Sequence, residues 1–210
     1  MSARNLLEIA DELRAIAASG LHFTEGEFDR ERYARLQSLA ARLANLSGAG
    51  AFEPLEELFR TGDRGYVTPK IDTRLAVFRG ERVLLVRERS DGRWSLPGGF
   101  VDVGDSPSSS AVREMSEEAG VAARVTGLAG VFDNRLNPLA PAQLFQVFKL
   151  VFTGELIDPS QAPSTSAETD AVEYHSLETL PELSPGRTLE THIRYAYAFS
   201  RGEQTSTHYD

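Results

Sequence analysis

The sequence has no cysteine among its 210 residues, which excludes disulfide bonds, thiolate metal sites and a cysteine nucleophile. It also lacks long uncharged hydrophobic runs, since the first apolar pattern already carries Glu8, Asp11 and Glu12. We therefore expect neither a leader peptide nor a membrane-spanning helix, and we predict a cytoplasmic protein. Positive charge is scarce: 22 Lys and Arg against 31 Asp and Glu leave a net charge of -9, which repels polyanions and disfavours broad nucleic-acid binding.

The chain does contain enough hydrophobic residues for one full core, at 41% of the sequence, with a smaller helical addition. Apolar residues recur at helical spacing over 6–17 and 33–43, and a shorter helix is expected over 52–59. Ser19-Gly20 is predicted to separate the first two helices, with Asp29 as the cap of the second. Such helices have little core of their own, so we expect them to pack on the main domain or to form a homodimer.

From Lys70 onward the apolar period changes to that of strands. A hairpin is predicted over 75–78 and 82–86, and the further strands and the closing helix fall at 122–125, 129–132, 143–152, 171–175 and 189–199. This order predicts an α+β fold with a mixed sheet between helical layers. The predicted organisation is a helical subdomain over 1–62, a main domain over 63–200 and a polar tail over 201–210.

The segment from residue 94 to residue 121 combines a strand end, a glycine turn and a short helix. Trp94 to Pro97 ends the strand, and Gly98-Gly99 supplies the backbone freedom for a tight turn beside a ligand. Asp105-Ser106 before Pro107 predicts a helix start, and Gly120 predicts its end. The segment therefore predicts one strand-turn-helix unit.

Three acidic residues of this helix, Glu114, Glu117 and Glu118, project from one face. Like charges at this spacing destabilise a helix by roughly 0.2 to 0.5 kcal/mol per pair unless a cation lies among them. Mg2+ prefers carboxylate oxygens and bridges to substrate phosphates. A solvated acidic face is the alternative interpretation, and the glycine turn beside the helix favours the metal site.

The pattern resembles the Nudix box, a motif of phosphoanhydride hydrolases. The matching residues are Gly99, Arg113, Glu114, Met115, Glu117, Glu118, Gly120 and Val121. Asp105 departs from the pattern, because it stands where the family usually has a glutamate. The resemblance implies an α/β/α sandwich, Mg2+ or Mn2+ as cofactor, and metal ligation by Glu114, Glu117, Glu118 and the carbonyl of Gly98.

The resemblance also implies catalytic roles. Arg113 would hold a box glutamate in place by a charged hydrogen bond, and Glu114 would act with the metal. The general base would be Glu118 or Glu168, since a carboxylate from a late loop often serves the family in this way. Substrate phosphates would be met by Arg87, Arg89 and Arg135, the last beside Asp133 in a predicted loop.

The amino-terminal stretch and the segments around residues 133–138 and 166–188 resemble the Nudix subgroup that contains bacterial CDP-choline pyrophosphatase. This favours CDP-choline as the small-molecule substrate. The homodimer is expected to form through the N-terminal helices because their own core is small, and composition and charge predict neither membrane nor nucleic-acid binding. The aromatic residues that could receive choline by cation-π contact are Phe132, Phe145, Tyr174 and Trp94. Hydrolysis of ADP-ribose or a nucleotide sugar, and a non-catalytic nucleotide sensor, stay open as alternatives.

Overall fold

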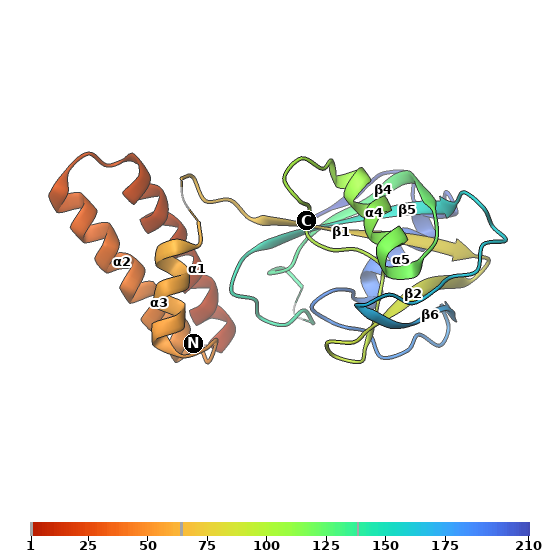
Figure 1. The fold of residues 1–210 in the computed structure, drawn as a ribbon, viewed down its shortest axis with the longest axis horizontal. Helices are drawn as coiled ribbons and strands as arrows, with labels where there is room; N and C mark the ends of the chain where they lie inside the picture. Colours follow the sequence, from red (N-terminus) through yellow and green to blue (C-terminus); the bar gives the residue numbers. More distant parts are fainter. Residues whose placement is uncertain (1, 64, 138) are drawn as a thin grey trace. The chain divides into compact units, whose positions relative to one another are not determined.

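The computed structural model describes residues 2–63, 65–137 and 139–210, and the chain forms two compact units (Figure 1). The helical unit contains the chain up to Lys70 together with Ala142–Gln146. The sheet unit contains Ile71–Pro141 and Val147–Asp210. Each unit has its own hydrophobic core. Among the described residues, no helix has the length and hydrophobicity needed to span a membrane.

The helical unit consists of α1 (Ala3–Phe23), α2 (Glu27–Leu46) and α3 (Phe52–Thr61). Its core is rich in alanine, which lets the helix backbones approach closely. The buried members of this core are Leu7, Ala10, Ala40, Ala41, Ala44, Leu55 and Phe59. The first helix begins where the hydroxyl of Ser2 accepts the N–H of Asn5, a standard N-cap.

Two predicted boundaries in this unit are wrong. Helix α1 runs through Ser19-Gly20 and ends at Phe23, because Gly20 serves helix packing and not a turn. A Cβ on Gly20 would lie 2.5 Å from the ring of Tyr33, so only glycine permits this approach of α2 to α1. Asp29 is not a cap either, since the cap position of α2 is Gly26 and Asp29 lies in the first turn.

A buried ion pair joins the segment 142–146 to the helices of the same unit. Arg14 donates from Nε and Nη2 to Oδ1 of Asp11, at 2.9 and 2.7 Å, and its Nη1 lies 2.7 Å from Asp63. The other oxygen of Asp11 accepts the N–H of Gln146 at 3.1 Å, and the guanidinium of Arg14 lies over the ring of Phe145. Asp11 therefore connects α1 to a segment about 135 positions further along the chain.

The sheet unit is built on a seven-stranded sheet in which β3, β2, β1, β5, β4 and β7 follow one another and β6 also pairs with β2. The strands are β1 (Lys70–Arg79), β2 (Arg82–Glu88), β3 (Trp94–Ser95), β4 (Ala123–Asp133), β5 (Val147–Leu156), β6 (Thr169–Ser176) and β7 (His208–Tyr209). Strand β2 is antiparallel to β1, β3 and β6, whereas β4 and β7 are parallel. The predicted α+β fold with a mixed sheet is therefore confirmed.

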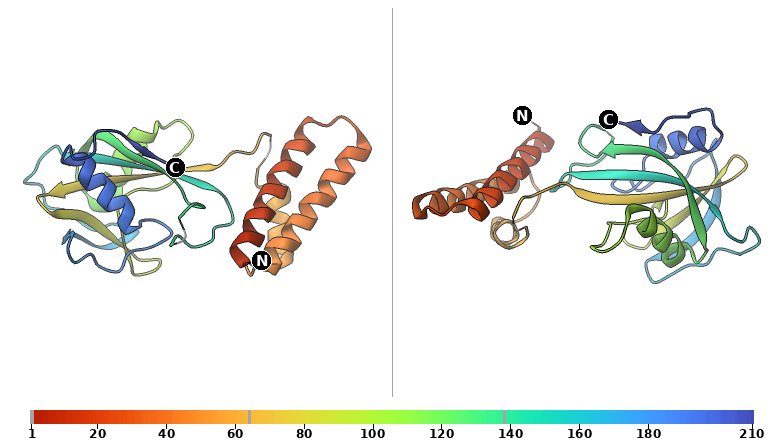
Figure 2. Two further views of the ribbon diagram at one scale, coloured as in Figure 1. Left: turned by 180° about the vertical axis from the view of Figure 1, so that it is seen from behind. Right: turned by 90° about the horizontal axis from the view of Figure 1, so that it is seen from above.

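Helices α4 (Pro107–Ala119) and α5 (Glu190–Ser200) cover opposite faces of this sheet (Figure 2). Because side chains alternate along a strand, Leu75 and Val77 of β1 pack in the core beneath α4. Ala76 between them packs in the core beneath α5. The metal-binding residues that the sequence predicts on α4 therefore belong to one face of the sheet.

Three regions of the sheet unit differ from the sequence-based prediction. The strand predicted over 143–152 is β5, which begins at Val147, because residues 142–146 belong to the helical unit. The strands predicted over 122–125 and 129–132 are one strand, β4, with register shifts near Val125 and Leu128. The tail predicted as polar forms β7 on the edge of β4, where Thr207 donates to the carbonyl of Leu128. The ring of His208 stacks on Phe132 and Tyr195. These aromatic contacts hold the tail on the sheet unit, and its polar composition does not predict them.

His192 at the start of α5 provides a prediction for the pH dependence of stability. Burial lowers the pKa of His192 to about 3, and its neutral Nδ1 accepts the N–H of Leu189 at 3.1 Å. The unfolded histidine titrates near 6.5, so the unfolded state gains a proton that the native state excludes as the pH falls below that value. Lowering the pH from 7 to 5 should therefore cost about 2 kcal/mol of unfolding free energy through this residue.

Urea unfolding of the wild type and of His192→Asn at both pH values measures this effect. Asparagine keeps an acceptor for the N–H of Leu189 but has no proton to gain, so the variant should lose less stability on acidification. An equal loss in the two proteins would show that His192 does not carry the effect.

Candidate active site

The site is built around the turn Leu96–Gly99, which connects β3 to the loop before α4. Gly98 has φ +146°, a conformation that favours glycine, and a Cβ on it would lie 1.9 Å from the carbonyl oxygen of Thr73. Its N–H donates to Oε2 of Glu118 at 2.9 Å. Gly98 is buried, yet its carbonyl has no hydrogen-bond donor among the residues that the structure describes. A buried carbonyl without a donor is a candidate ligand for a cation.

Helix α4 follows as the sequence predicts. Ser106 caps it, since its hydroxyl accepts the N–H of Ser109 while the Ser109 hydroxyl accepts the N–H of Ser106. Pro107 occupies the first helical position, and Gly120 ends the helix with φ +65°. Met115 and Ala119 are buried against the sheet, which turns the acidic side chains toward the glycine turn.

The three glutamates of α4 differ in environment. Glu118 is 5% exposed, and its burial raises its pKa to about 8. Glu114 is partly buried, with a carboxylate so close to the turn that a Cβ on Gly99 would lie 3.1 Å from Oε1; burial raises its pKa as well. Glu117 is mostly exposed. Two carboxylates thus lie against the two glycines of the turn, and burial raises the pKa of both.

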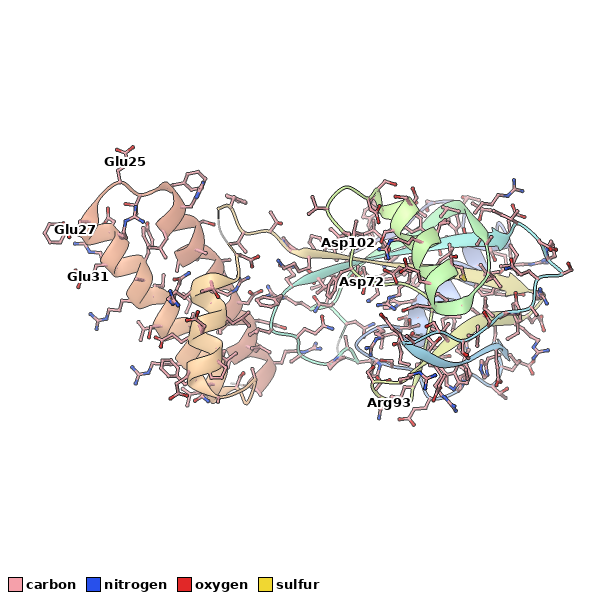
Figure 3. The ribbon with its side chains drawn as sticks, in the orientation of Figure 1. Glu25, Glu27, Glu31, Asp72, Arg93 and Asp102 are labelled. Carbon is pink, nitrogen blue, oxygen red and sulfur yellow. The ribbon has the colours of Figure 1, made fainter. Side chains whose placement is uncertain are left out.

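Arg113 connects the acids of the helix to the loop before it. Its guanidinium lies 2.8 Å from Glu117, 3.0 Å from Glu114, 3.2 Å from Asp105 and 3.5 Å from Asp102. The hydrogen bond that Arg113 donates to Asp105 raises the pKa of Arg113, so the shorter side chain at this position still reaches the arginine. Figure 3 shows Asp102 on the loop that leads into α4.

The donors at this site are those that a hard divalent cation prefers. They are the carboxylates of Glu114 and Glu118, the accessible carboxylate of Glu117 and the carbonyl of Gly98. Within residues 2–63, 65–137 and 139–210, no three acidic or histidine side chains yet enclose a point where a metal could bind. Arg113 holds Glu114 and Glu117 on one side while Glu118 reaches Gly98.

Glu168 belongs to the same part of the sheet unit through its backbone. The carbonyl of Glu168 accepts the N–H of Arg89 at 2.9 Å, directly after β2. The next residue, Thr169, is fully buried and donates its hydroxyl to the carbonyl of Glu118 at 2.7 Å. The side chain of Glu168 is exposed. The structure therefore places the loop of Glu168 against the end of the acidic helix.

The substrate-binding candidates fall into two groups. Arg89 adjoins Glu168, and Arg87 on β2 pairs with Asp170 at 2.6 Å. Asp133 lies at the end of β4, where its carboxylate accepts the N–H of Arg135 at 2.9 Å. Strands β1 and β5 lie between β2 and β4, so the two groups do not form one cluster.

A buried charged network beside the glycine turn was not predicted from the sequence. Its members, Asp72, Arg74, Glu88 and Lys149, are each about 5% exposed. Figure 3 shows Asp72 on β1. The available signal was the pair of charged residues Asp72 and Arg74 inside the strand sequence 70–78. A charged side chain is rarely buried in a strand without a partner of opposite charge. Lys149 offers the same signal in the apolar run of β5.

Three relatives match over most of their length. Bacillus subtilis YjhB, which carries the provisional name ADP-ribose pyrophosphatase, is 36% identical over 204 residues, 97% of this chain and 96% of YjhB. The crystal structure of a UDP-X diphosphatase is 31% identical, covers both chains fully and has a TM-score of 0.63. The crystal structure of an ADP-ribose pyrophosphatase from Streptococcus suis is 34% identical, covers 68% of this chain and all of that one, and has a TM-score of 0.61.

Two family models match separate parts of the sequence. Residues 4–59 match the UDP-X-like N-terminal oligomerisation domain, and residues 69–195 match the NUDIX domain. The second match contains the glycine turn, the acidic helix and the loop of Glu168. With these matches, the relatives and the fold in agreement, the chain belongs to the Nudix hydrolase family, and it is a Nudix pyrophosphatase.

Proposed function

We propose that this chain hydrolyses a nucleoside diphosphate linked to a second group, X, and that it requires Mg2+, with Mn2+ as a substitute. The observation that carries the proposal is the buried hydrogen bond between Glu118 and the N–H of Gly98, whose carbonyl receives no hydrogen bond from the described residues. Hard donors grouped at one turn suit a divalent cation that also contacts phosphate.

The residues have separate roles in this proposal. Glu114, Glu117, Glu118 and the carbonyl of Gly98 would hold the metal, which when bound neutralises phosphate oxygens and aligns water for attack. Arg113 would orient Glu114 and Glu117, whose carboxylates lie 3.0 and 2.8 Å from its Nη1. Water adds to one phosphorus and the bridging P–O bond breaks, giving a nucleoside monophosphate and phospho-X. Glu118 or Glu168 takes the proton of the water.

The sequence and the named relatives suggest different identities for X. The sequence favours CDP-choline, whose cation would need an aromatic cage. In the structure, Trp94 makes an edge-to-face contact with His175, Tyr174 lies under Arg79, and Phe132 stacks with His208, so these rings already have other partners. The relatives carry the names ADP-ribose pyrophosphatase and UDP-X diphosphatase. We therefore rank ADP-ribose and UDP-linked sugars beside CDP-choline as the substrates to compare.

A substrate panel tests this proposal. ADP-ribose, UDP-glucose and CDP-choline are incubated with the protein and Mg2+, and phosphatase-sensitive products are quantified. At least one should be hydrolysed, and EDTA should abolish the reaction. Calorimetric heat of binding without phosphomonoester products would instead favour a nucleotide sensor.

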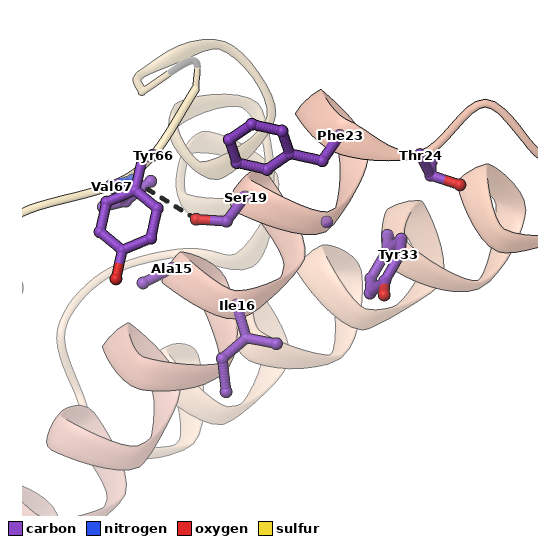
Figure 4. Close-up of a pocket in the computed structure, with 9 residues that line it drawn as sticks. Ala15, Ile16, Ser19, Phe23, Thr24, Tyr33, Tyr66 and Val67 are labelled. Carbon is purple, nitrogen blue, oxygen red and sulfur yellow. Dashed lines mark hydrogen bonds between the residues drawn. The ribbon is translucent and has the colours of Figure 1, made fainter.

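We also propose that the chain forms a homodimer through the helical unit. A cavity of about 600 Å³ opens on α1, and Ile16, Phe23, Tyr33 and Tyr66 contribute to its lining (Figure 4). Ile16, Phe23 and Tyr66 are 50%, 67% and 77% exposed, an apolar surface that a second copy would cover. The match of residues 4–59 to an oligomerisation domain supports the same conclusion.

Ile16→Glu should convert this dimer into a monomer, because a charged side chain would have to be buried in the apolar contact. Light scattering at micromolar concentration measures the mass. Leu46→Glu is the matched control, since Leu46 is 75% exposed at the end of α2 and does not line the cavity, so it should leave the dimer intact. A wild-type mass of one chain would refute the proposal.

A further inference from the structure

Leu96, the residue between β3 and the glycine turn, has both of its backbone hydrogen-bonding groups held by side chains from distant parts of the sheet unit. Its N–H donates to Oγ1 of Thr188 at 2.9 Å, and its carbonyl accepts from Nη1 of Arg74 at 3.2 Å. Thr188 is fully buried and Arg74 is 4% exposed. Strand β3 ends at Ser95, so the sheet ladder does not continue to this residue.

Arg74 is itself held in a single orientation. Its Nε and Nη2 donate to the two oxygens of Asp72 at 2.9 and 2.7 Å, and Lys149 donates to the same carboxylate at 2.9 Å. Burying three charges for the sake of stability alone is inefficient, because apolar side chains of similar volume stabilise a core as well or better. The contacts of Asp72 and Lys149 instead fix the guanidinium of Arg74 in the orientation in which it donates to the carbonyl of Leu96.

The path from Leu96 to the candidate metal ligands is short and stiff. Pro97 follows with a restricted backbone, and its carbonyl accepts the N–H of Leu75 at 2.9 Å. Gly98 comes next, with its N–H on Glu118, and the carbonyl of Gly99 accepts the N–H of Thr73 at 2.8 Å. A shift of Leu96 would therefore move the Gly98 carbonyl relative to Glu118.

We propose that Arg74 and Thr188 are positioning residues for the metal site, which hold Leu96 and thereby set the Gly98 carbonyl opposite the carboxylate of Glu118. Asp72 and Lys149 hold Arg74 in turn. This inference rests on the proposed metal dependence. The proposal adds residues that maintain the geometry of the glycine turn and that lie outside the segment 99–121.

Binding of Mn2+ to the substrate-free full-length protein, followed by the electron paramagnetic resonance signal of free Mn2+, tests the inference. Thr188→Val and Arg74→Lys should each weaken Mn2+ binding roughly tenfold, as expected for residues that orient metal ligands. Thr188→Ser keeps the hydroxyl and should restore wild-type affinity. In turnover assays the first two variants should need more metal for half-maximal kcat, while KM for the nucleotide at saturating metal stays unchanged.

Arg14→Lys is the matched control, because Arg14 makes a similar buried fork with Asp11 in the helical unit. It should lower the unfolding temperature and leave Mn2+ affinity unchanged. Should Arg74→Lys fail to fold, the comparison of Thr188→Val with Thr188→Ser tests the inference without it. Wild-type affinity in Thr188→Val, with normal Mn2+ binding by the wild type, would overturn the positioning role alone. Absence of Mn2+ binding by the wild type would overturn the proposed metal site itself.

Discussion

Glu118→Gln should lower kcat by about 10³-fold and at the same time stabilise the metal-free protein. Glutamine keeps an acceptor for the N–H of Gly98 but removes the charge that a cation or a proton from water would need. Without a metal, burial raises the pKa of Glu118 to about 8, so at pH 7 folding must protonate this carboxyl, which costs stability. Its removal should therefore raise the unfolding free energy at pH 7 by on the order of 2 kcal/mol.

Steady-state kinetics with Mg2+ and thermal unfolding in EDTA measure the two effects. Glu178→Gln is the control, because Glu178 is exposed and lies outside the site, so neither quantity should change. The opposite signs distinguish a functional carboxylate from a structural one. If the Gln variant turned over at the wild-type rate, Glu118 would be neither a metal ligand nor the base.

Gly98→Ala should destabilise the protein by about 3 to 5 kcal/mol and abolish measurable turnover. The new Cβ would lie 1.9 Å from the carbonyl oxygen of Thr73. Neither atom can rotate away as the end of a side chain could, so the backbone of the turn would have to move. Movement of the turn would disrupt the hydrogen bond from the Gly98 N–H to Glu118. Urea unfolding and the activity assay measure the two losses.

Gly92→Ala provides the comparison for Gly98. Gly92 also has positive φ, at +69°, but a Cβ there would meet no atom within 4 Å. Its replacement should cost only about 1 to 2 kcal/mol, from the left-handed conformation, and should not change kcat. Equal costs at the two positions would show that the close approach to Thr73 is not what requires glycine.

The local features of the site could be read from the sequence because nearby residues determine them. The cap at Ser106, the proline at the first helical position and the stop at Gly120 each depend on chemistry within a few residues. The hairpin of β1 and β2 follows from the alternating pattern and the short turn at Gly80. For this reason the strand, the glycine turn and the acidic helix lie where the sequence predicts them.

Features that depend on distant contacts could not be read in the same way. Ser19-Gly20 is typical of a turn in sequence. Only the contact with the ring of Tyr33, on another helix, shows that Gly20 is needed for close packing of the two helices. Arg74 and Thr188 meet Leu96 from positions 22 before and 92 after it, so no local pattern joins them. The roles of Glu168 and of the arginines stay predictions, because geometry places them and does not test them.

Phosphorus nuclear magnetic resonance of the reaction with ADP-ribose and Mg2+ tests the central claim most directly, with UDP-glucose and CDP-choline in parallel. The proposed function predicts that the diphosphate signals of at least one substrate are replaced by two monoester signals of equal intensity, and that EDTA or Glu118→Gln prevents this. Intact diphosphate signals for all three substrates, or release of orthophosphate as the first product, would contradict it.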